Sequence, residues 1–196
     1  DRKTTNVGYE ISSMNKIIVA DIFGRTSALL ALCSAIKADI IVDPYDGKMM
    51  GFDNEAHAYH YFTENVGFDD YVEKLSKIMN ECTDESTLIG FSVGATAIWQ
   101  LSESTSTKIR KLVKSAICYY GSQIRHLTKL SPIFDVKLVF PKSEPHFDVQ
   151  ALNRLLANKP KVTTLQVDYF HGFMNYHSDN FNQAGYAEHV ALLQHA

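Results

Sequence analysis

The sequence lacks the features that mark several large classes of protein. Its 196 residues contain no apolar run near the roughly 18 residues that a membrane span needs, and no cluster of Lys and Arg. The formal net charge is −3 and the sequence pI is about 6.2. Because nucleic acids and anionic membranes attract basic patches, we expect neither as a partner and consider a small molecule instead.

Cysteine is scarce and forms no recognisable pattern. The three cysteines, Cys33, Cys82 and Cys118, are widely spaced and include no C-x-x-C pair. Reduced thiols in a cytoplasmic protein are the simplest interpretation. The polar first residues lead into no signal-peptide core, which also favours a cytoplasmic location.

No linker, repeat or low-complexity segment divides the chain. Apolar residues make up 45% and charged residues 21%, as is usual for a globular protein. The sequence therefore predicts one domain over residues 1–196, as a monomer or a homodimer. Residues 1–13, which precede Met14, are interpreted as an additional N-terminal segment.

Short apolar runs alternate with amphipathic helical stretches along the chain. The expected strands are 16–20, 39–42, 86–89, 115–119, 136–140 and 162–167. The expected helices are 26–37, 68–79, a stretch from 95, 148–156, and one that contains 187–193. This order predicts an α/β domain with a mostly parallel sheet, helices on both faces and no large lid. Ligands of such sheets bind beyond the carboxyl ends of the strands.

The most informative motif is Gly90-Phe91-Ser92-Val93-Gly94. An apolar strand precedes it, and small and apolar residues at helical spacing follow it. Strand, sharp turn and helix are the context in which G-x-S-x-G exposes a nucleophilic serine. Ser92 is therefore the candidate nucleophile, against the alternative of an idle serine in a glycine-rich turn.

A nucleophilic serine needs a base, and the base needs an acid that orients it. His171 follows the last expected strand and satisfies the order serine, acid, histidine; His146, which precedes that strand, competes with it. Glu144 and Asp148 both follow the strand that ends at Phe140. We favour Glu144, because Asp148 has an alternative role as a helix N-cap. His57 and His60 could share a helical face, but no third metal ligand is in view, so no metal site is expected.

Several segments resemble the dienelactone hydrolase family of α/β-hydrolases. They are Asp21-Ile22-Phe23-Gly24, Asp43-Pro44-Tyr45, the serine motif, Tyr119-Tyr120-Gly121 and His171-Gly172-Phe173. The resemblance runs in order from about Lys16 to the C-terminus. It implies an α/β-hydrolase fold with Ser92 in the place of the nucleophile, which is cysteine in the founding enzymes, and Glu144 in the place of the acid.

The resemblance also implies further site residues. The backbone N–H groups of Ile22 and Val93 would form the oxyanion hole, and Asp21 matches an acidic residue that lies near the nucleophile. The family's acid is usually an aspartate in a Gly-x-x-Asp setting, and here Pro141 replaces that glycine. The residues expected to line the site are Asp21, Phe23, Tyr45, Phe91, Tyr120 and Phe173, which would suit a small apolar or aromatic acyl group.

The arginines depart from the family's pattern. Dienelactone enzymes hold the substrate carboxylate with arginine, and one such position follows the His-x-Phe segment, where this chain has Met174-Asn175. A dienelactone is therefore not expected as the substrate, and a neutral or less acidic ester or lactone is favoured, cleaved by a serine hydrolase without a metal or organic cofactor. The alternatives are a serine peptidase or thioesterase on the same scaffold, and a binding protein that kept the fold without catalysis.

Overall fold

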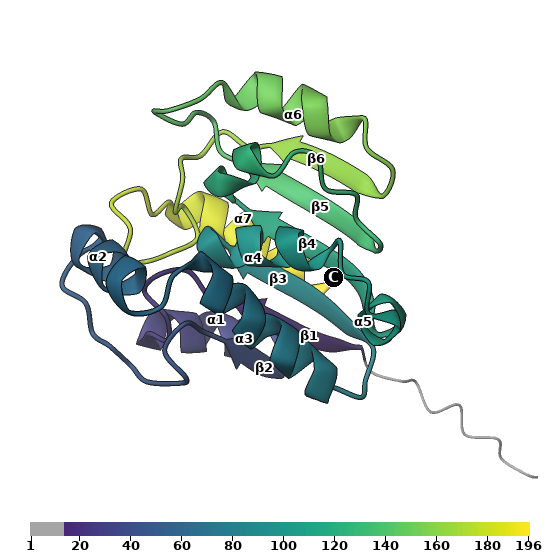
Figure 1. The fold of residues 1–196 in the computed structure, drawn as a ribbon. Helices are drawn as coiled ribbons and strands as arrows, with labels where there is room; N and C mark the ends of the chain where they lie inside the picture. The colour runs from purple at the N-terminus through teal and green to yellow at the C-terminus, as the bar shows by residue number, and fades with distance from the viewer. Residues whose placement is uncertain (1–13) are drawn as a thin grey trace, which may run out of the picture.

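A parallel sheet of six strands forms the centre of the molecule (Figure 1). The computed structural model describes residues 14–196, so the interpretation of residues 1–13 lies outside the described part. The strand order is β2-β1-β3-β4-β5-β6, and every neighbouring pair is parallel. The strands are β1 (Asn15–Val19), β2 (Ile40–Val42), β3 (Ser86–Phe91), β4 (Val113–Tyr119), β5 (Asp135–Phe140) and β6 (Val162–Gln166). The predicted α/β architecture is confirmed.

Helices cover both faces of the sheet (Figure 1). On one face, α1 (Ser27–Ile36) and α7 (Gln183–Gln194) contribute buried Leu32, Ile36 and Leu193 to an apolar cluster. The other face carries the remaining α-helices, which are α2 (Glu55–Asn65), α3 (Phe68–Glu81), α4 (Val93–Leu101), α5 (Thr107–Leu112) and α6 (Val149–Ala157). All six residues of β3 are buried, because helices lie against both of its sides.

Three helical segments were not predicted from the sequence: α2, α5 and the 3₁₀ helix Ser122–His126. Only Ala58 and Phe62 are buried in α2, so the sequence of this helix shows little apolar periodicity. The start of α2 is stabilised by an N-cap, in which Asn54 Oδ1 accepts a hydrogen bond from His57 N. The other two segments are short, with 6 and 5 residues, and offer too few positions for a period to show.

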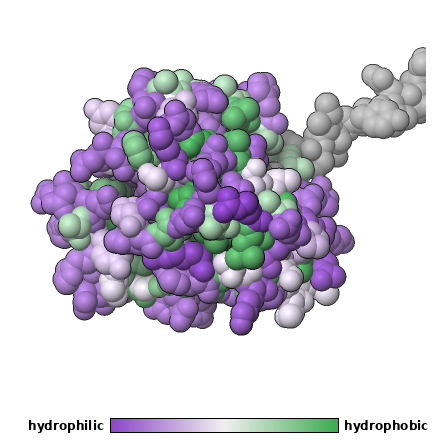
Figure 2. Space-filling model, turned by 90° about the horizontal axis from the view of Figure 1, so that it is seen from above, coloured by the Kyte–Doolittle hydropathy of each residue, from purple (hydrophilic) through white to green (hydrophobic). Residues whose placement is uncertain are grey.

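The surface seen from above in Figure 2 is mainly polar, and its apolar residues lie in small groups among the polar ones. Among the helices of residues 14–196, none has both the length and the apolar character that crossing a membrane would need.

The order in which the chain adds strands to the sheet reverses at β1. From β1 the chain adds β2 on one side of the sheet, and then returns to place β3 on the other side of β1. The loops that leave β1 and β3 therefore diverge at their carboxyl ends, which creates the crevice where ligands bind in open α/β sheets. Asp21 and Ile22 follow β1 and Ser92 follows β3, so the fold places all three at this crevice.

Candidate active site

Ser92 occupies a strained turn between β3 and α4. Its backbone has φ 53° and ψ −116°, a conformation that non-glycine residues rarely adopt. A hydrogen bond of 2.9 Å from Ser92 N to Tyr119 O holds the turn against β4. Strain of this kind persists where the surrounding structure fixes it, and it is frequent at active sites. The predicted strand, turn and helix around Ser92 are thus present.

The two glycines of the motif let three elements pack closely around this turn. A Cβ at Gly90 would lie 2.8 Å from Ala95 Cα on α4. A Cβ at Gly94 would collide with the carbonyl oxygens of Val19 and Ala20 at the end of β1. Gly94 therefore allows the first turn of α4 to approach the end of β1, the strand that leads into Asp21 and Ile22.

We expect Gly94→Ala to destabilise the protein by about 3 kcal/mol, because the added methyl meets rigid backbone and overpacking of this kind is costly. Ester hydrolysis, proposed below, should fall with it as β1 shifts. Gly51→Ala is the comparison: its Cβ would meet nothing within 4 Å, and φ is +65°, so it carries only a backbone cost of about 1 kcal/mol. The urea midpoints of the two variants measure their losses of stability. If Gly94→Ala and Gly51→Ala lose the same free energy of unfolding, this account of Gly94 is contradicted.

A continuous series of hydrogen bonds joins the candidate nucleophile, base and acid. Ser92 Oγ lies 3.2 Å from His171 Nε2, and His171 Nδ1 lies 2.8 Å from Glu144 Oε1. The side chain of Glu144 is 8% exposed and that of His171 is 23% exposed. With Nδ1 protonated toward the carboxylate, Nε2 is the acceptor for the serine hydroxyl.

The loops that carry Glu144 and His171 are tied together by the backbone. Lys142 N, just beyond β5, donates a hydrogen bond of 2.7 Å to Tyr169 O, just beyond β6. Glu144 also pairs with Phe147 in an isolated antiparallel bridge, which folds its loop tightly. The ring of Tyr120 packs against the imidazole with 4.9 Å between centroids. These contacts fix the positions of both Glu144 and His171.

The competing candidates lie elsewhere. Asp148 is exposed, and its Oδ1 accepts a hydrogen bond of 3.0 Å from Ala151 N, so it caps α6. His146 is exposed in the same loop. His57 and His60 lie exposed on α2. Within residues 14–196, no group of three or more His, Cys, Asp and Glu could hold a metal ion.

The two amides expected to form the oxyanion hole are available as donors. Val93 is the first residue of α4, where a backbone N–H has no partner inside the helix. Ile22 follows β1, and within residues 14–196 neither amide hydrogen has an acceptor. Tyr45 Oη donates a hydrogen bond of 2.5 Å to Ile22 O and so anchors the loop that follows β1.

Asp21 is a carboxyl group held in a poorly solvated place. Its oxygens accept hydrogen bonds from Phe23 N at 2.9 Å and from Asn175 Nδ2 at 2.6 Å. Burial disfavours the charged form and raises the pKa of Asp21 from 3.8 to about 6, while these two hydrogen bonds and the nearby His171 oppose the shift. Asp21 is thus ionised at neutral pH at a cost to stability.

We expect Asp21→Asn to stabilise the protein at pH 8 by about 1–3 kcal/mol. The folded state keeps the Asp21 proton up to about pH 6, whereas the unfolded chain releases it near pH 4, so the wild type loses stability as the pH rises between these values. The gain should therefore vanish toward pH 4. Urea midpoints at pH 4, 6 and 8 test this, with Asp53→Asn, an exposed carboxylate, as the control. A variant that is less stable at every pH would contradict the prediction.

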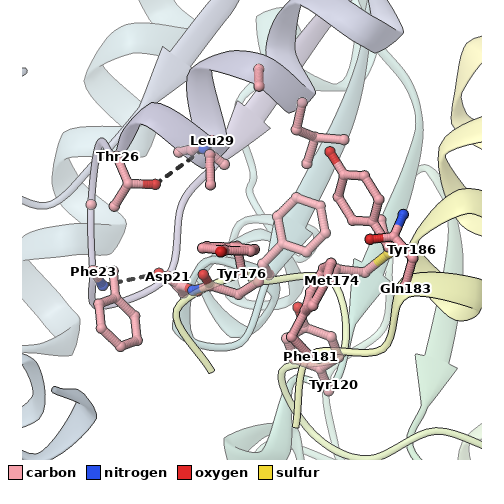
Figure 3. A pocket seen from close by; sticks show the side chains of 16 residues that line it. Asp21, Phe23, Thr26, Leu29, Tyr120, Met174, Tyr176, Phe181, Gln183 and Tyr186 are labelled. Carbon is pink, nitrogen blue, oxygen red and sulfur yellow. Dashed lines mark hydrogen bonds between the residues drawn. The ribbon is translucent and has the colours of Figure 1, made fainter. Parts of the chain in front are cut away.

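A cavity of about 270 Å³ lies next to the candidate triad (Figure 3). Ser92, Glu144 and His171 do not line it themselves, but it is bordered by Phe91, the residue before Ser92, and by Tyr120, whose ring packs against His171. Four of the residues expected to line the site border it: Asp21, Phe23, Phe91 and Tyr120. Two others are placed differently. Tyr45 lies under the loop after β1 and borders another hollow, and Phe173 lies instead in the core with its side chain fully buried against Tyr119, Tyr120 and His189.

Sequence reasoning missed the far wall of the cavity. Met174, Tyr176 and Phe181, on the segment ahead of α7, face α1 and the loop after β1 across the hollow (Figure 3). It also missed Asn175 as the partner of Asp21. One signal in the sequence could have identified Met174 and Asn175 as site residues, because they stand where the family resemblance implies a substrate-binding arginine.

Comparison with solved structures identifies the fold. A candidate hydrolase of the α/β superfamily from Xanthomonas campestris pv. campestris aligns with 94% of this chain and 100% of its own, at TM-score 0.58 and 14% identity. Est1E from Butyrivibrio proteoclasticus aligns with 95% of this chain and 88% of its own, at TM-score 0.60 and 8% identity. A cold-adapted esterase from an Arctic intertidal metagenomic library aligns with 95% and 84%, at TM-score 0.60 and 15% identity. The protein therefore has the α/β-hydrolase fold.

The sequence comparisons add one relative. The chain is 29% identical over 186 residues to the uncharacterized protein YczH of Bacillus subtilis (strain 168), which covers 91% of this chain and 89% of the relative. No protein-family model matches the chain. Membership of the dienelactone hydrolase family stays a prediction.

Proposed function

We propose that the protein is a serine hydrolase that cleaves a small carboxylic ester or lactone through an acyl-enzyme. The observation that carries this proposal is the hydrogen-bonded series from Glu144 through His171 to Ser92, which ends on a strained turn at the crevice between β1 and β3. The cold-adapted esterase among the structures of similar fold agrees with it.

The first half of the proposed reaction forms the acyl-enzyme. His171 Nε2 takes the proton of Ser92 as Oγ bonds to the carbonyl carbon, and Glu144 stabilises the imidazolium. The N–H groups of Ile22 and Val93 donate to the oxygen that becomes negative, each worth on the order of 3 kcal/mol. The bond from carbon to the alcohol oxygen then breaks, and His171 delivers its proton to the departing alcohol.

The second half releases the acid. Water gives a proton to His171 Nε2 and bonds to the acyl carbon, and the bond to Ser92 Oγ breaks as the serine recovers its proton. In a lactone the alcohol remains part of the product, so one molecule of hydroxy acid forms from lactone and water. These steps need only the residues named above and water.

A neutral substrate fits the charges around the site. Asp21 borders the cavity beside the triad, and Asn175, in the place of the family's arginine, donates to Asp21. The arginine nearest in sequence to Asp21, Arg25, is paired with Asp43 at 3.1 Å. A substrate carboxylate would thus meet a carboxylate and not a guanidinium, which argues against a dienelactone as the substrate.

Hydrolysis of a series of p-nitrophenyl esters from acetate to octanoate tests the proposal directly. We expect release of p-nitrophenol by the wild type with a preference for short acyl chains, since the cavity is small. If the wild type turns over no ester and also resists a fluorophosphonate probe, the hydrolase proposal fails and a non-catalytic binding protein takes its place.

A further inference from the structure

The cavity between α1 and the segment ahead of α7 adjoins the triad through three residues of its wall. Asp21 precedes Ile22, whose amide is proposed to bind the oxyanion, and Phe91 precedes Ser92. The ring of Tyr120 forms part of the wall and also packs against His171. The cavity is therefore next to the residues that hold the proposed nucleophile, base and oxyanion hole.

The wall is largely apolar and carries no positive charge. Its apolar lining residues include Leu29, Leu32, Phe91, Met174 and Phe181, and Figure 3 shows Leu29, Met174 and Phe181 around the hollow. Among the lining residues, all within residues 14–196, there is no Arg, Lys or His, and Asp21 is the one carboxylate. A cavity of about 150 Å³ is enough to bind benzene, so the space of about 270 Å³ holds a substituted ring or a branched chain.

The open side of the triad favours one assignment of the substrate's two halves. His171, which protonates the departing alcohol, keeps 23% of its side chain exposed. The alcohol can therefore leave directly to solvent. The acyl group stays bonded to Ser92 until water releases it, and an apolar cavity that begins at Phe91, the residue before the serine, suits the part of the substrate that stays.

Resting on the proposed hydrolase function, we propose that this cavity binds the acyl side chain of the substrate, and that this side chain is an uncharged aromatic or branched group and not one that carries a carboxylate. Apolar burial would hold it, while the negative charge of Asp21 and the absence of a cation in the wall would exclude an acyl group with a second carboxylate.

The size of the acyl site is tested with p-nitrophenyl acetate and p-nitrophenyl phenylacetate. Ala28, on the first turn of α1, borders the cavity, so Ala28→Phe fills it. We expect the ratio of kcat/KM for phenylacetate to that for acetate to fall at least about tenfold in this variant. Ser34→Phe places the same ring on the exposed side of α1 and should leave the ratio within about twofold. Thermal melting of both variants shows that they are folded.

The charge of the acyl site is tested at pH 8 with two esters of nearly equal size, the p-nitrophenyl esters of 4-methylphenylacetic and 4-carboxyphenylacetic acid. We expect the wild type to prefer the uncharged ester by at least about tenfold, and Asp21→Asn to reduce that preference severalfold. Equal rates for the two esters, or an unchanged ratio in Ala28→Phe, would overturn this inference while the hydrolase function stands. Hydrolysis of none of the esters by the wild type would overturn both.

Discussion

Ser92→Ala is expected to lower kcat for ester hydrolysis on the order of 10⁴- to 10⁶-fold, which is the largest effect that any substitution should have. The alanine removes the only atom that bonds to the acyl carbon, and no neighbouring group in the described hydrogen-bonded series can replace it. Steady-state rates with p-nitrophenyl acetate measure the loss. The fold should survive, because the backbone bond from residue 92 N to Tyr119 O does not involve the side chain.

The control for this substitution is Ser34→Ala, which removes the same hydroxyl from an exposed position on α1. Its rate should stay within about twofold of the wild type. A Ser92→Ala variant that melts at the wild-type temperature and retains most of the activity would show that the hydrolysis does not pass through Ser92.

Glu144→Gln is expected to lower kcat about 10²- to 10⁴-fold. The glutamate accepts a hydrogen bond from His171 Nδ1 at 2.8 Å and so keeps Nε2 free to take the serine proton. A glutamine amide can donate to Nδ1 instead, which puts the ring proton on Nε2, the wrong nitrogen. It also provides no charge to stabilise the imidazolium. The serine should then be less nucleophilic while the protein stays folded.

Asp148→Asn separates this role from that of the second acid in the same loop. Asparagine caps helices as well as aspartate does, so this variant should keep both the stability of α6 and a rate within about twofold of the wild type. The reverse pattern, with a large loss in Asp148→Asn and little in Glu144→Gln, would identify Asp148 as the acid of the working enzyme.

The fold could be predicted because its signals are local and repeated. Strands such as Leu88-Ile89 read as apolar runs since helices cover both sides of the sheet, and α3 shows Tyr71, Leu75 and Met79 four residues apart on its buried face. The helix α2 gave no such signal, because its eleven residues bury only two side chains.

The hydrogen-bonded series of candidate residues could be predicted in part for a related reason. Parallel strands bring their carboxyl ends to one edge, so chain order alone placed Ser92, Glu144 and His171 near one another. The preference for Glu144 over Asp148 came from the capping role of the aspartate, and the structure shows that cap.

The far wall of the cavity could not be predicted from sequence, because it depends on how two distant segments meet. Met174 and Phe181 border the cavity only since the segment ahead of α7 folds back toward α1. Phe173 was expected at the same site, but its backbone turns the ring the other way, into the core beside Tyr119 and His189. Adjacent residues of an irregular segment carry no periodicity that would tell the two faces apart.

Labelling by a fluorophosphonate probe, read by mass spectrometry of the intact protein and of its peptides, tests the central claim most directly. The account predicts a single adduct on Ser92 in the wild type, no adduct in Ser92→Ala, and much slower labelling in Glu144→Gln, because the probe reacts only with a serine that a base has activated. A wild-type protein that stays unlabelled, or a Ser92→Ala variant that labels as fast as the wild type, would contradict it.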